Sequence, residues 1–319
     1  SVINEQGQSL ESWNNQKWMV PASNMKLVTS AAVLEELGGE FRYQTPLYVR
    51  GYLDDSTWVG DLMIVGKGDP SISGFLYEKN RYHVFEQLRK ILKKAGISDW
   101  TGQWIGRLGY FDAEIYPKGW DWDDLNFYYG VEISELSFNN NAVDLEVLAE
   151  GEVGETPQIS WFPKQTDYVH FINKQRIAPA HTKYDEYYRR SRQTNKMYLA
   201  SSLPKGYKES ESLAIYDAPA FFMDSFVDYL EAHSMEDIVQ YRAPYRIERW
   251  WPDLLEPSIN QSLIGLASEQ LGTALWSGYP PNWYSTDTAS DPMTGWKYLG
   301  AVESPELYQL ITWLKKDSD

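Results

Sequence analysis

The chain has 319 residues, enough for one large or two ordinary domains with a buried core. Its formal net charge is −16, which argues against a nucleic-acid partner because phosphate binding needs a basic surface. The absence of cysteine excludes disulfides and thiolate metal sites, and the four histidines are scattered along the sequence. No apolar run approaches the roughly 18 residues that a bilayer-spanning helix needs, so no integral membrane segment is expected.

Two elements are predicted near the N-terminus. Val2-Ile3 and Trp18-Met19-Val20 are expected to pair as the strands of a hairpin. A helix is predicted to begin at Ser23, because apolar residues follow it at helical spacing. Gly38-Gly39 is expected to end this helix, since glycine readily adopts the left-handed conformation found after helix C-termini.

The middle of the chain is predicted to be rich in strands. Residues 41–66 alternate with period two and are interrupted at Gly51 and at Asp54-Asp55, the pattern of a strand, a turn and a second strand. Further helices are expected at 82–96, 218–233, 258–275 and 304–316. This order predicts one discontinuous α/β domain, residues 1–40 and 216–319, interrupted by a β-rich inserted region at 41–215.

The first predicted helix opens with Ser23-Asn24-Met25-Lys26. The spacing of i and i+3 places the serine and lysine side chains on one helical face. A serine hydroxyl is a poor nucleophile until a neighbour takes its proton, and an uncharged lysine amine can do so. The pattern alone is weak, because it recurs at Ser202-Leu203-Pro204-Lys205, where the proline disfavours a helix. On spacing alone, a helix cap at Ser23 and a solvated charge at Lys26 are the commoner arrangement.

The wider sequence narrows these alternatives. Pro21-Ala22-Ser23-x-x-Lys26-Leu27, followed by Gly38-Gly39, resembles the active-site segment of the class C penicillin-binding proteins, the D-alanyl-D-alanine carboxypeptidase/endopeptidase family. The resemblance continues, in the family's order, through Gly66-Lys67-Gly68-Asp69-Pro70, Gly119-Trp120-Asp121-Trp122 and Leu136-Ser137-Phe138-Asn139-x-Asn141. It covers the first half of the chain well.

This resemblance implies a fold and an activity. The fold is the penicillin-binding-protein/β-lactamase-like transpeptidase domain, an α/β fold with an antiparallel sheet flanked by helices, here with a large β-rich insertion. The activity is that of a serine peptidase in which Ser23 is the nucleophile and Lys26 its base, acting on D-Ala-D-Ala or D-Ala-linked bonds. Peptidoglycan stem peptides are the expected substrates and β-lactams the expected covalent inhibitors. No cofactor or metal is expected, and the location is periplasmic or otherwise extracytoplasmic.

The family's second motif, Ser-x-Asn, occurs at Ser12-x-Asn14, Ser137-x-Asn139 and Ser258-x-Asn260. Ser137 falls in a segment that resembles a different stretch of the family, so it is expected to be structural. Ser258 and Asn260 precede an apolar helical pattern, at a distance from Ser23 that suits a large insertion. The resemblance implies that Ser258 relays a proton and that Asn260 binds the substrate amide, and the alternative is a simple helix cap.

The family's third motif, Lys-Thr-Gly or Lys-Ser-Gly, does not occur in the sequence. Either the chain stops before that strand or the protein is degenerate there, so turnover is left open. A catalytically impaired wall-binding or scaffold protein on the same fold is therefore the main alternative. An esterase or β-lactamase with the same Ser-Lys chemistry is a further one.

Aromatic residues are frequent, with 14 Trp and 23 Tyr. Most of them are expected in the core, and a groove that stacks on sugars is the alternative. The acidic and aromatic run at 120–124 is predicted to be a solvated turn with buried tryptophans rather than a glycosidase site with paired carboxylates.

Overall fold

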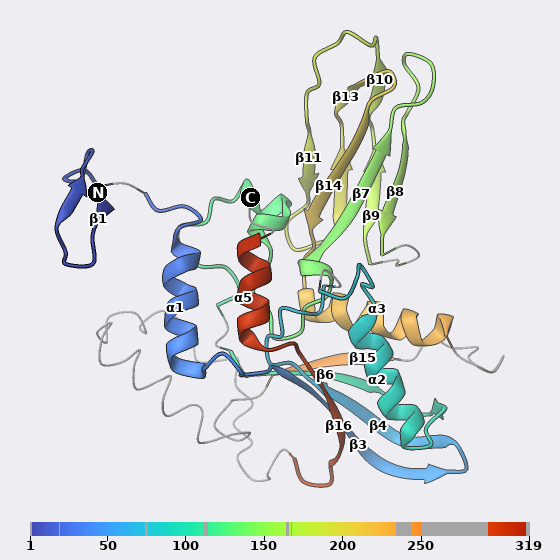
Figure 1. Ribbon diagram of the computed structural model, residues 1–319. Helices are drawn as coiled ribbons and strands as arrows, with labels where there is room; N and C mark the ends of the chain where they lie inside the picture. The colour runs from blue at the N-terminus through green and yellow to red at the C-terminus, as the bar shows by residue number, and fades with distance from the viewer. Residues whose placement is uncertain are drawn as a thin grey trace. The chain divides into compact units, whose positions relative to one another are not determined.

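The computed structural model describes residues 2–18, 20–73, 76–111, 114–163, 166, 168–233, 244–249 and 293–316. The chain divides into two compact units (Figure 1). The first comprises Ser1–Arg42 and Pro305–Asp319, and the second comprises Tyr43–Ser304.

The first unit contains an N-terminal hairpin of β1 (Val2–Ile3) and β2 (Ser9–Glu11). The prediction that residues 18–20 would pair with β1 is therefore wrong. Asn4 sets the turn between the two strands, since its Oδ1 accepts hydrogen bonds from the backbone N–H groups of Gln6 at 3.1 Å and Gln8 at 2.8 Å. Both strands are exposed along their whole length, so their sequence lacks the alternation from which a partner can be recognised.

Two helices complete the first unit, α1 (Met25–Leu37) and α5 (Leu307–Lys316). The predicted stop of the first helix is confirmed. Gly38 follows the last turn with φ 78°, and its N–H donates to the carbonyl of Leu34 at 3.1 Å. A glycine is suited to this position because a Cβ disfavours positive φ.

The second unit is organised around a six-stranded sheet. Its strands are β3 (Gln44–Asp54), β4 (Thr57–Val65), β5 (Asp99–Trp100), β6 (Trp104–Leu108), β15 (Tyr245–Arg249) and β16 (Lys297–Glu303). The order is β15-β6-β4-β3-β16, with β5 paired to β4. β3 is antiparallel to β4 and β16, whereas the pairings of β4 with β5 and β6, and of β6 with β15, are parallel. Two of these strands, β15 and β16, lie outside the segment predicted as an insertion, and the boundaries at 41 and 215 stay a prediction.

The predicted break at Gly51 is wrong, because β3 continues through it to Asp54. Gly51 lies opposite Gly60 in the β3–β4 pair. A Cβ on Gly51 would lie 2.1 Å from the carbonyl oxygen of Val59. The glycine therefore permits a close approach of two backbones rather than ending the strand.

The remaining strands lie between residues 142 and 214 and are drawn in green to yellow in Figure 1. β7 (Ala142–Leu148) is the central strand of an antiparallel sheet with β8 (Gln158–Phe162) and β14 (Lys208–Ala214). A second three-stranded sheet has the order β11 (Tyr188–Arg190), β12 (Lys196–Leu199) and β9 (His170–Asn173). β10 (Arg176–Ala178) pairs in parallel with β13 (Ser202–Pro204). The short 3-10 helices are η1 (Asp124–Asn126), η2 (Tyr128–Gly130) and η3 (Asn139–Asn141).

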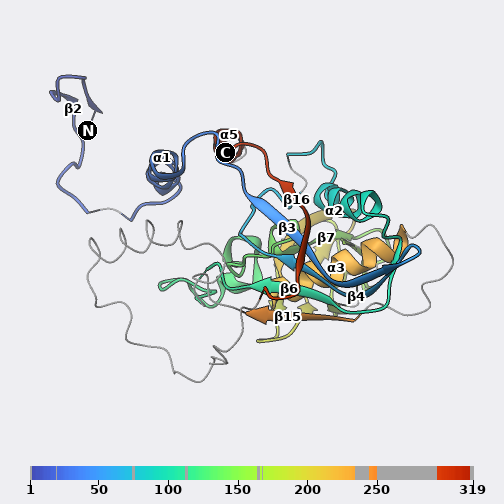
Figure 2. The same cartoon turned by 90° about the horizontal axis from the view of Figure 1, so that it is seen from below.

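Two long helices of the second unit confirm the predictions at 82–96 and 218–233. They are α2 (His83–Lys94) and α3 (Ala218–Ala232), and Figure 2 shows them beside the strands of the six-stranded sheet. The Asp217 carboxylate accepts a hydrogen bond from the N–H of Ala220 at 3.3 Å and so caps α3. The helix predicted at 258–275 lies outside the described residues.

The segment Gly66–Pro70 shows why two of its glycines are needed. The N–H of Gly66 donates to the Arg107 carbonyl and that of Gly68 to the Glu135 carbonyl, both at 2.9 Å. A Cβ on Gly66 would lie 2.7 Å from the backbone carbon of Glu135, and one on Gly68 would lie 2.2 Å from the ring of Phe111. Segments far apart in the sequence therefore meet here at backbone distance.

We expect Gly66→Ala to lower the free energy of unfolding by about 2–4 kcal/mol, because a buried backbone must move to admit the methyl group. Gly39→Ala is the matched control, since its Cβ would meet nothing closer than 3.6 Å. Urea unfolding followed by tryptophan fluorescence measures both variants. Equal midpoints for the two variants would contradict the steric explanation.

Asp69 is a second buried feature of this segment, with 2% of its surface exposed. One carboxylate oxygen accepts a hydrogen bond from the N–H of Ser71 at 2.8 Å, and the other has no hydrogen-bond partner among the described residues. Burial raises the pKa of the Asp69 carboxyl, and the hydrogen bonds from Ser71 offset only part of this rise. The folded protein therefore holds the Asp69 proton more tightly than the unfolded chain does.

The raised pKa of Asp69 in the folded state determines whether stability rises or falls with pH. The contribution of Asp69 to stability is complete below the unfolded pKa of about 4 and is lost as the pH rises through the folded pKa. Asp69→Asn keeps the acceptor for Ser71 and cannot ionise. We therefore expect the free energy of unfolding of the variant, relative to the wild type, to increase between about pH 4 and pH 7. Urea titrations at both pH values measure this change, and a decrease would show that Asp69 is stabilised as the anion.

Candidate active site

Ser23 lies in a turn directly before α1. The N–H of Met25 donates to the Ala22 carbonyl at 3.0 Å, and the N–H of Lys26 donates to the Ser23 carbonyl at 3.1 Å. Such i to i+3 bonds wind the chain more tightly than an α-helix does. The α-helix therefore begins at Met25, two residues after the start predicted at Ser23.

The side chain of Asn24 organises this turn. Asn24 is the N-cap residue of α1, and its Oδ1 accepts a hydrogen bond from the N–H of Ala22 at 2.9 Å. The sequence allowed Ser23 to be the N-cap residue of this helix. In the structure Asn24 occupies that position. The turn holds the backbone on both sides of Ser23.

Two of the four predicted catalytic residues, Ser23 and Lys26, lie one turn apart and differ in exposure. Ser23 is exposed and Lys26 is half-buried. Met25, Leu27 and Val28 beside them are 47%, 57% and 62% exposed. The hydroxyl-bearing residue is therefore accessible on a surface with apolar character, and the lysine is partly shielded from water.

Backbone hydrogen bonds join the C-terminal end of α1 to α5. The N–H of Leu307 donates to the Phe41 carbonyl at 2.8 Å, and the N–H of Tyr308 donates to the Gly39 carbonyl at 3.1 Å. These bonds satisfy N–H groups in the first turn of α5, which have no partner within the helix. The segment that leaves α1 and the start of α5 are thereby fixed to each other.

The second Ser-x-x-Lys copy has a different geometry. Ser202 begins strand β13, which also contains Pro204. The Nζ of Lys205 forms an ion pair with Glu152 at 2.9 Å. This confirms the prediction that Pro204 prevents a helical pairing, and only the first copy lies at a helix start.

Two copies of the Ser-x-Asn motif, Ser137-x-Asn139 and Ser258-x-Asn260, differ in their location relative to the described part of the chain. Ser258 and Asn260 lie outside the described residues. Asn139 and Asn141 are buried, and their side-chain amides donate to the backbone carbonyls of Ala142 and Glu132, both at 2.9 Å. All three residues of η3 have positive φ, a conformation that asparagine adopts more easily than most residues. This copy therefore shapes a buried turn.

The prediction of buried tryptophans at 120–124 is wrong. Trp120 is 39% exposed and Trp122 is 56% exposed. The guanidinium groups of Arg189 and Arg192 lie 5.7 Å and 5.8 Å from the centre of the Trp122 ring. Cations over an exposed ring stabilise it at the surface, a possibility that composition alone does not reveal.

Two further observations come from the described residues. No group of three or more His, Asp or Glu side chains among them is placed to hold a metal ion. None of the helices in this described part is long and apolar enough to cross a membrane.

Known proteins provide the next observation. The sequence profile of the D-Ala-D-Ala carboxypeptidase 3 (S13) family matches residues 3–244, more than half of the chain. The chain belongs to this family. The resemblance inferred from Ser23 to Asn141 is thereby confirmed at the level of the family.

Three relatives share similar identity with this chain over different lengths. D-alanyl-D-alanine carboxypeptidase DacB of Haemophilus influenzae is 27% identical over 156 residues, which cover 49% of this chain and 31% of the relative. The D-alanyl-D-alanine carboxypeptidase of an Actinomadura species is 27% identical over 221 residues, covering 67% and 39%. Penicillin-sensitive carboxypeptidase A of Dictyostelium discoideum is 28% identical over 158 residues, covering 47% and 29%. The aligned segments thus span about a third of the length of these relatives.

Solved structures identify the fold. The crystal structure of penicillin-binding protein 4 (dacB) from H. influenzae aligns with a TM-score of 0.66 at 20% identity, covering 98% of this chain and 57% of that one. A structure of the same protein in complex with a novel β-lactam aligns with a TM-score of 0.60 at 17% identity. These alignments confirm the predicted fold class, with sheets flanked by helices and a β-rich region.

The turn before α1 generates a prediction. Asn24→Ala removes the acceptor for the Ala22 N–H and should lower the free energy of unfolding by about 1 kcal/mol. Asn24→Asp keeps an acceptor at this position and adds a negative charge near a helix N-terminus, so it should retain the wild-type stability. Chemical denaturation of both variants measures the difference. If the two variants behaved alike, the hydrogen bond would not be what holds the turn.

Proposed function

We propose that Ser23 is the nucleophile of a serine peptidase that hydrolyses D-Ala-D-Ala or D-Ala-linked bonds of peptidoglycan through an acyl-enzyme. The observation that carries this proposal is the exposed Ser23, one turn from the half-buried Lys26, at the start of α1. Both residues lie within the part of the chain that matches the carboxypeptidase family. Two of the relatives are named D-alanyl-D-alanine carboxypeptidases.

The first step is acylation. The Ser23 Oγ attacks the carbonyl carbon of the scissile bond while the uncharged Lys26 amine takes the hydroxyl proton. Backbone N–H groups at the helix start, including that of Ser23, stabilise the oxyanion of the tetrahedral adduct. The C–N bond then breaks, the leaving amine takes a proton, and the acyl group stays on Ser23 as an ester.

Water completes the cycle. It attacks the ester carbonyl while the Lys26 amine takes one of its protons, the C–O bond to Ser23 breaks, and this proton passes to Oγ as the acid leaves. In this scheme Ser258 passes the proton to the leaving amine and Asn260 holds the peptide. No metal ion or cofactor takes part in either step.

The same proposal identifies partners and location. Peptidoglycan stem peptides are the substrates, and β-lactams acylate the same Ser23. Because the substrate belongs to the cell wall, the protein acts in the periplasm or otherwise outside the cytoplasm.

Intact-protein mass after exposure to benzylpenicillin tests the nucleophile. We expect a covalent adduct on the wild-type chain and its complete loss in Ser23→Ala. Ser202→Ala is the matched control, because Ser202 belongs to the second Ser-x-x-Lys copy and lies on a strand. This variant should keep the adduct.

Two other results would contradict the proposal. An adduct that persists in Ser23→Ala would place the nucleophile elsewhere. A folded wild-type chain that forms no adduct would favour the wall-binding or scaffold alternative.

A further inference from the structure

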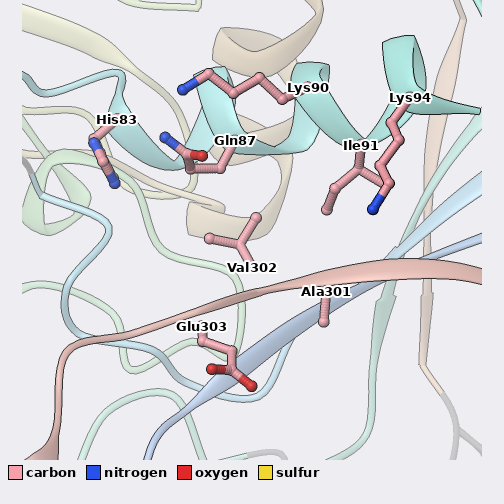
Figure 3. A pocket seen from close by; sticks show the side chains of 8 residues that line it. All are labelled: His83, Gln87, Lys90, Ile91, Lys94, Ala301, Val302 and Glu303. Carbon is pink, nitrogen blue, oxygen red and sulfur yellow. The ribbon is translucent and has the colours of Figure 1, made fainter.

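The pocket between α2 and the edge strand β16 does not bring its charged groups together. Its volume is about 350 Å³, and Figure 3 shows the side chains that line it. The ammonium groups of Lys90 and Lys94 point toward opposite ends, and the Glu303 carboxylate is turned away from α2 (Figure 3). These charges do not converge on one ligand group.

A different surface of the second unit gathers aromatic rings around one guanidinium group. Arg189 is an exposed residue of β11, and Tyr198 lies opposite it on β12. Residues directly opposite each other in an antiparallel pair stand on the same face of the sheet. Side chains alternate along a strand, so Tyr187 shares this face while Tyr188 is buried. The Arg189 guanidinium lies 5.7 Å from the centre of the Tyr187 ring.

Trp122 adds a third ring from the loop at 119–130. The guanidinium groups of Arg189 and Arg192 lie 5.7 Å and 5.8 Å from the centre of the Trp122 ring. Face-to-face contact needs about 4 Å, so neither guanidinium covers the indole. Trp122, Tyr187 and Tyr198 are 56%, 44% and 39% exposed. These three rings and the two arginines are called the arginine–aromatic face below.

The loop that carries Trp122 is attached to β11. The backbone N–H of Arg190 donates to the Asn126 Oδ1, and the Arg190 Nη2 donates to the Leu125 carbonyl, both at 2.9 Å. Two segments far apart in the sequence are thereby joined beside the arginine–aromatic face. The rings are therefore presented by anchored backbone on both sides.

Both arginines of this face are open to an external anion. Among the residues that the structure describes, neither Arg189 nor Arg192 forms an ion pair. This holds although the chain has a net charge of −16. A guanidinium group matches the geometry of a carboxylate and can donate two parallel hydrogen bonds to it. The two arginines therefore favour a ligand that carries a carboxylate.

The exposed rings indicate what else the ligand carries. A pyranose ring presents a flat face of C–H groups, and stacking on an indole removes both apolar surfaces from water. Asp121 and Asp123 flank Trp122 in the chain and are exposed, and carboxylates accept hydrogen bonds from hydroxyl groups. Nucleobases also stack on aromatic side chains. The two aspartates would repel a phosphate dianion more strongly than a single carboxylate, which favours the sugar.

We propose that the arginine–aromatic face binds a saccharide that carries a carboxylate, with the sugar ring against Trp122 and the carboxylate at the guanidinium groups of Arg189 and Arg192. The face belongs to the second unit, whereas Ser23 belongs to the first. The inference does not rest on the proposed acyl transfer and can fail or succeed independently of it.

N-acetylmuramic acid and N-acetylglucosamine form a matched pair of probes, because they share a ring and differ in one lactyl carboxylate. Ligand-observed NMR titration of the full chain should give saturable binding of N-acetylmuramic acid with a Kd of about 1–10 mM. N-acetylglucosamine should bind at least about threefold more weakly. Arg189→Gln should weaken N-acetylmuramic acid about three- to fivefold and change N-acetylglucosamine less than about twofold. Trp122→Ala should remove the binding of both sugars.

Two variants serve as controls. Arg176→Gln removes the same charge from the exposed β10, which belongs to another sheet. Tyr52→Ala removes a ring that is 63% exposed on β3. Each should change the Kd of N-acetylmuramic acid less than about twofold. Thermal unfolding of every variant shows whether it remains folded.

The proposal would be overturned by the absence of saturable N-acetylmuramic acid binding up to about 50 mM, or by equal effects of Arg189→Gln and Arg176→Gln. Equal affinity for N-acetylglucosamine would show that the carboxylate is not recognised. Equal affinity for lactate would show an anion site without a sugar contact. Tighter binding of uridine monophosphate would show a nucleotide site instead.

Discussion

The second unit depends above all on the packing around Phe85, a fully buried side chain of α2. Its ring lies 4.6 Å from that of Phe138 and meets Phe222 and Phe226 of α3 edge-on, each at 5.2 Å. Phe226 in turn meets Trp104 of β6 at 5.1 Å. Aromatic rings in such arrangements add directional attraction to the burial of large apolar areas. Phe85 thus joins α2 to α3 and to the loop at Phe138, and Phe226 continues these contacts to the sheet.

Two of the segments that resemble the family, Gly66–Pro70 and the one that begins at Leu136, have a shared structural basis. Gly66 and Gly68 let their strand end approach the backbone of Glu135 and the ring of Phe111. The Glu135 carboxylate accepts hydrogen bonds from the N–H groups of Gly109 and Phe111, both at 3.0 Å. Asn139 continues the same segment as a buried turn. Short motifs that are far apart in the sequence therefore describe one set of contacts, and this is why they are informative together and weak singly.

The sequence predicts long elements well because burial imposes a period on them, as in the helices at 83–94 and 218–232. Prediction from sequence fails for exposed elements, because they show no regular pattern of apolar and polar residues. The exposed strand Val2–Ile3 was assigned the wrong partner, and Gly51 was taken for a strand end because the sequence does not show that Gly60 lies opposite. At the candidate site, the Ser-x-x-Lys spacing alone does not distinguish Ser23 from Ser202 as the predicted nucleophile. The resemblance to the family is what favoured Ser23.

The pairing of β16 with β3 has a consequence for synthesis. Gln44 and Glu303, which are hydrogen-bonded across this pair, lie 259 positions apart in the chain. During synthesis β3 therefore leaves the ribosome long before β16 has been made. Until then, the edge of β3 that pairs with β16 is open. Such edges recruit other strands, so the interval favours misassociation and gives chaperones a reason to engage. Pairing between strands so far apart in sequence generally slows folding.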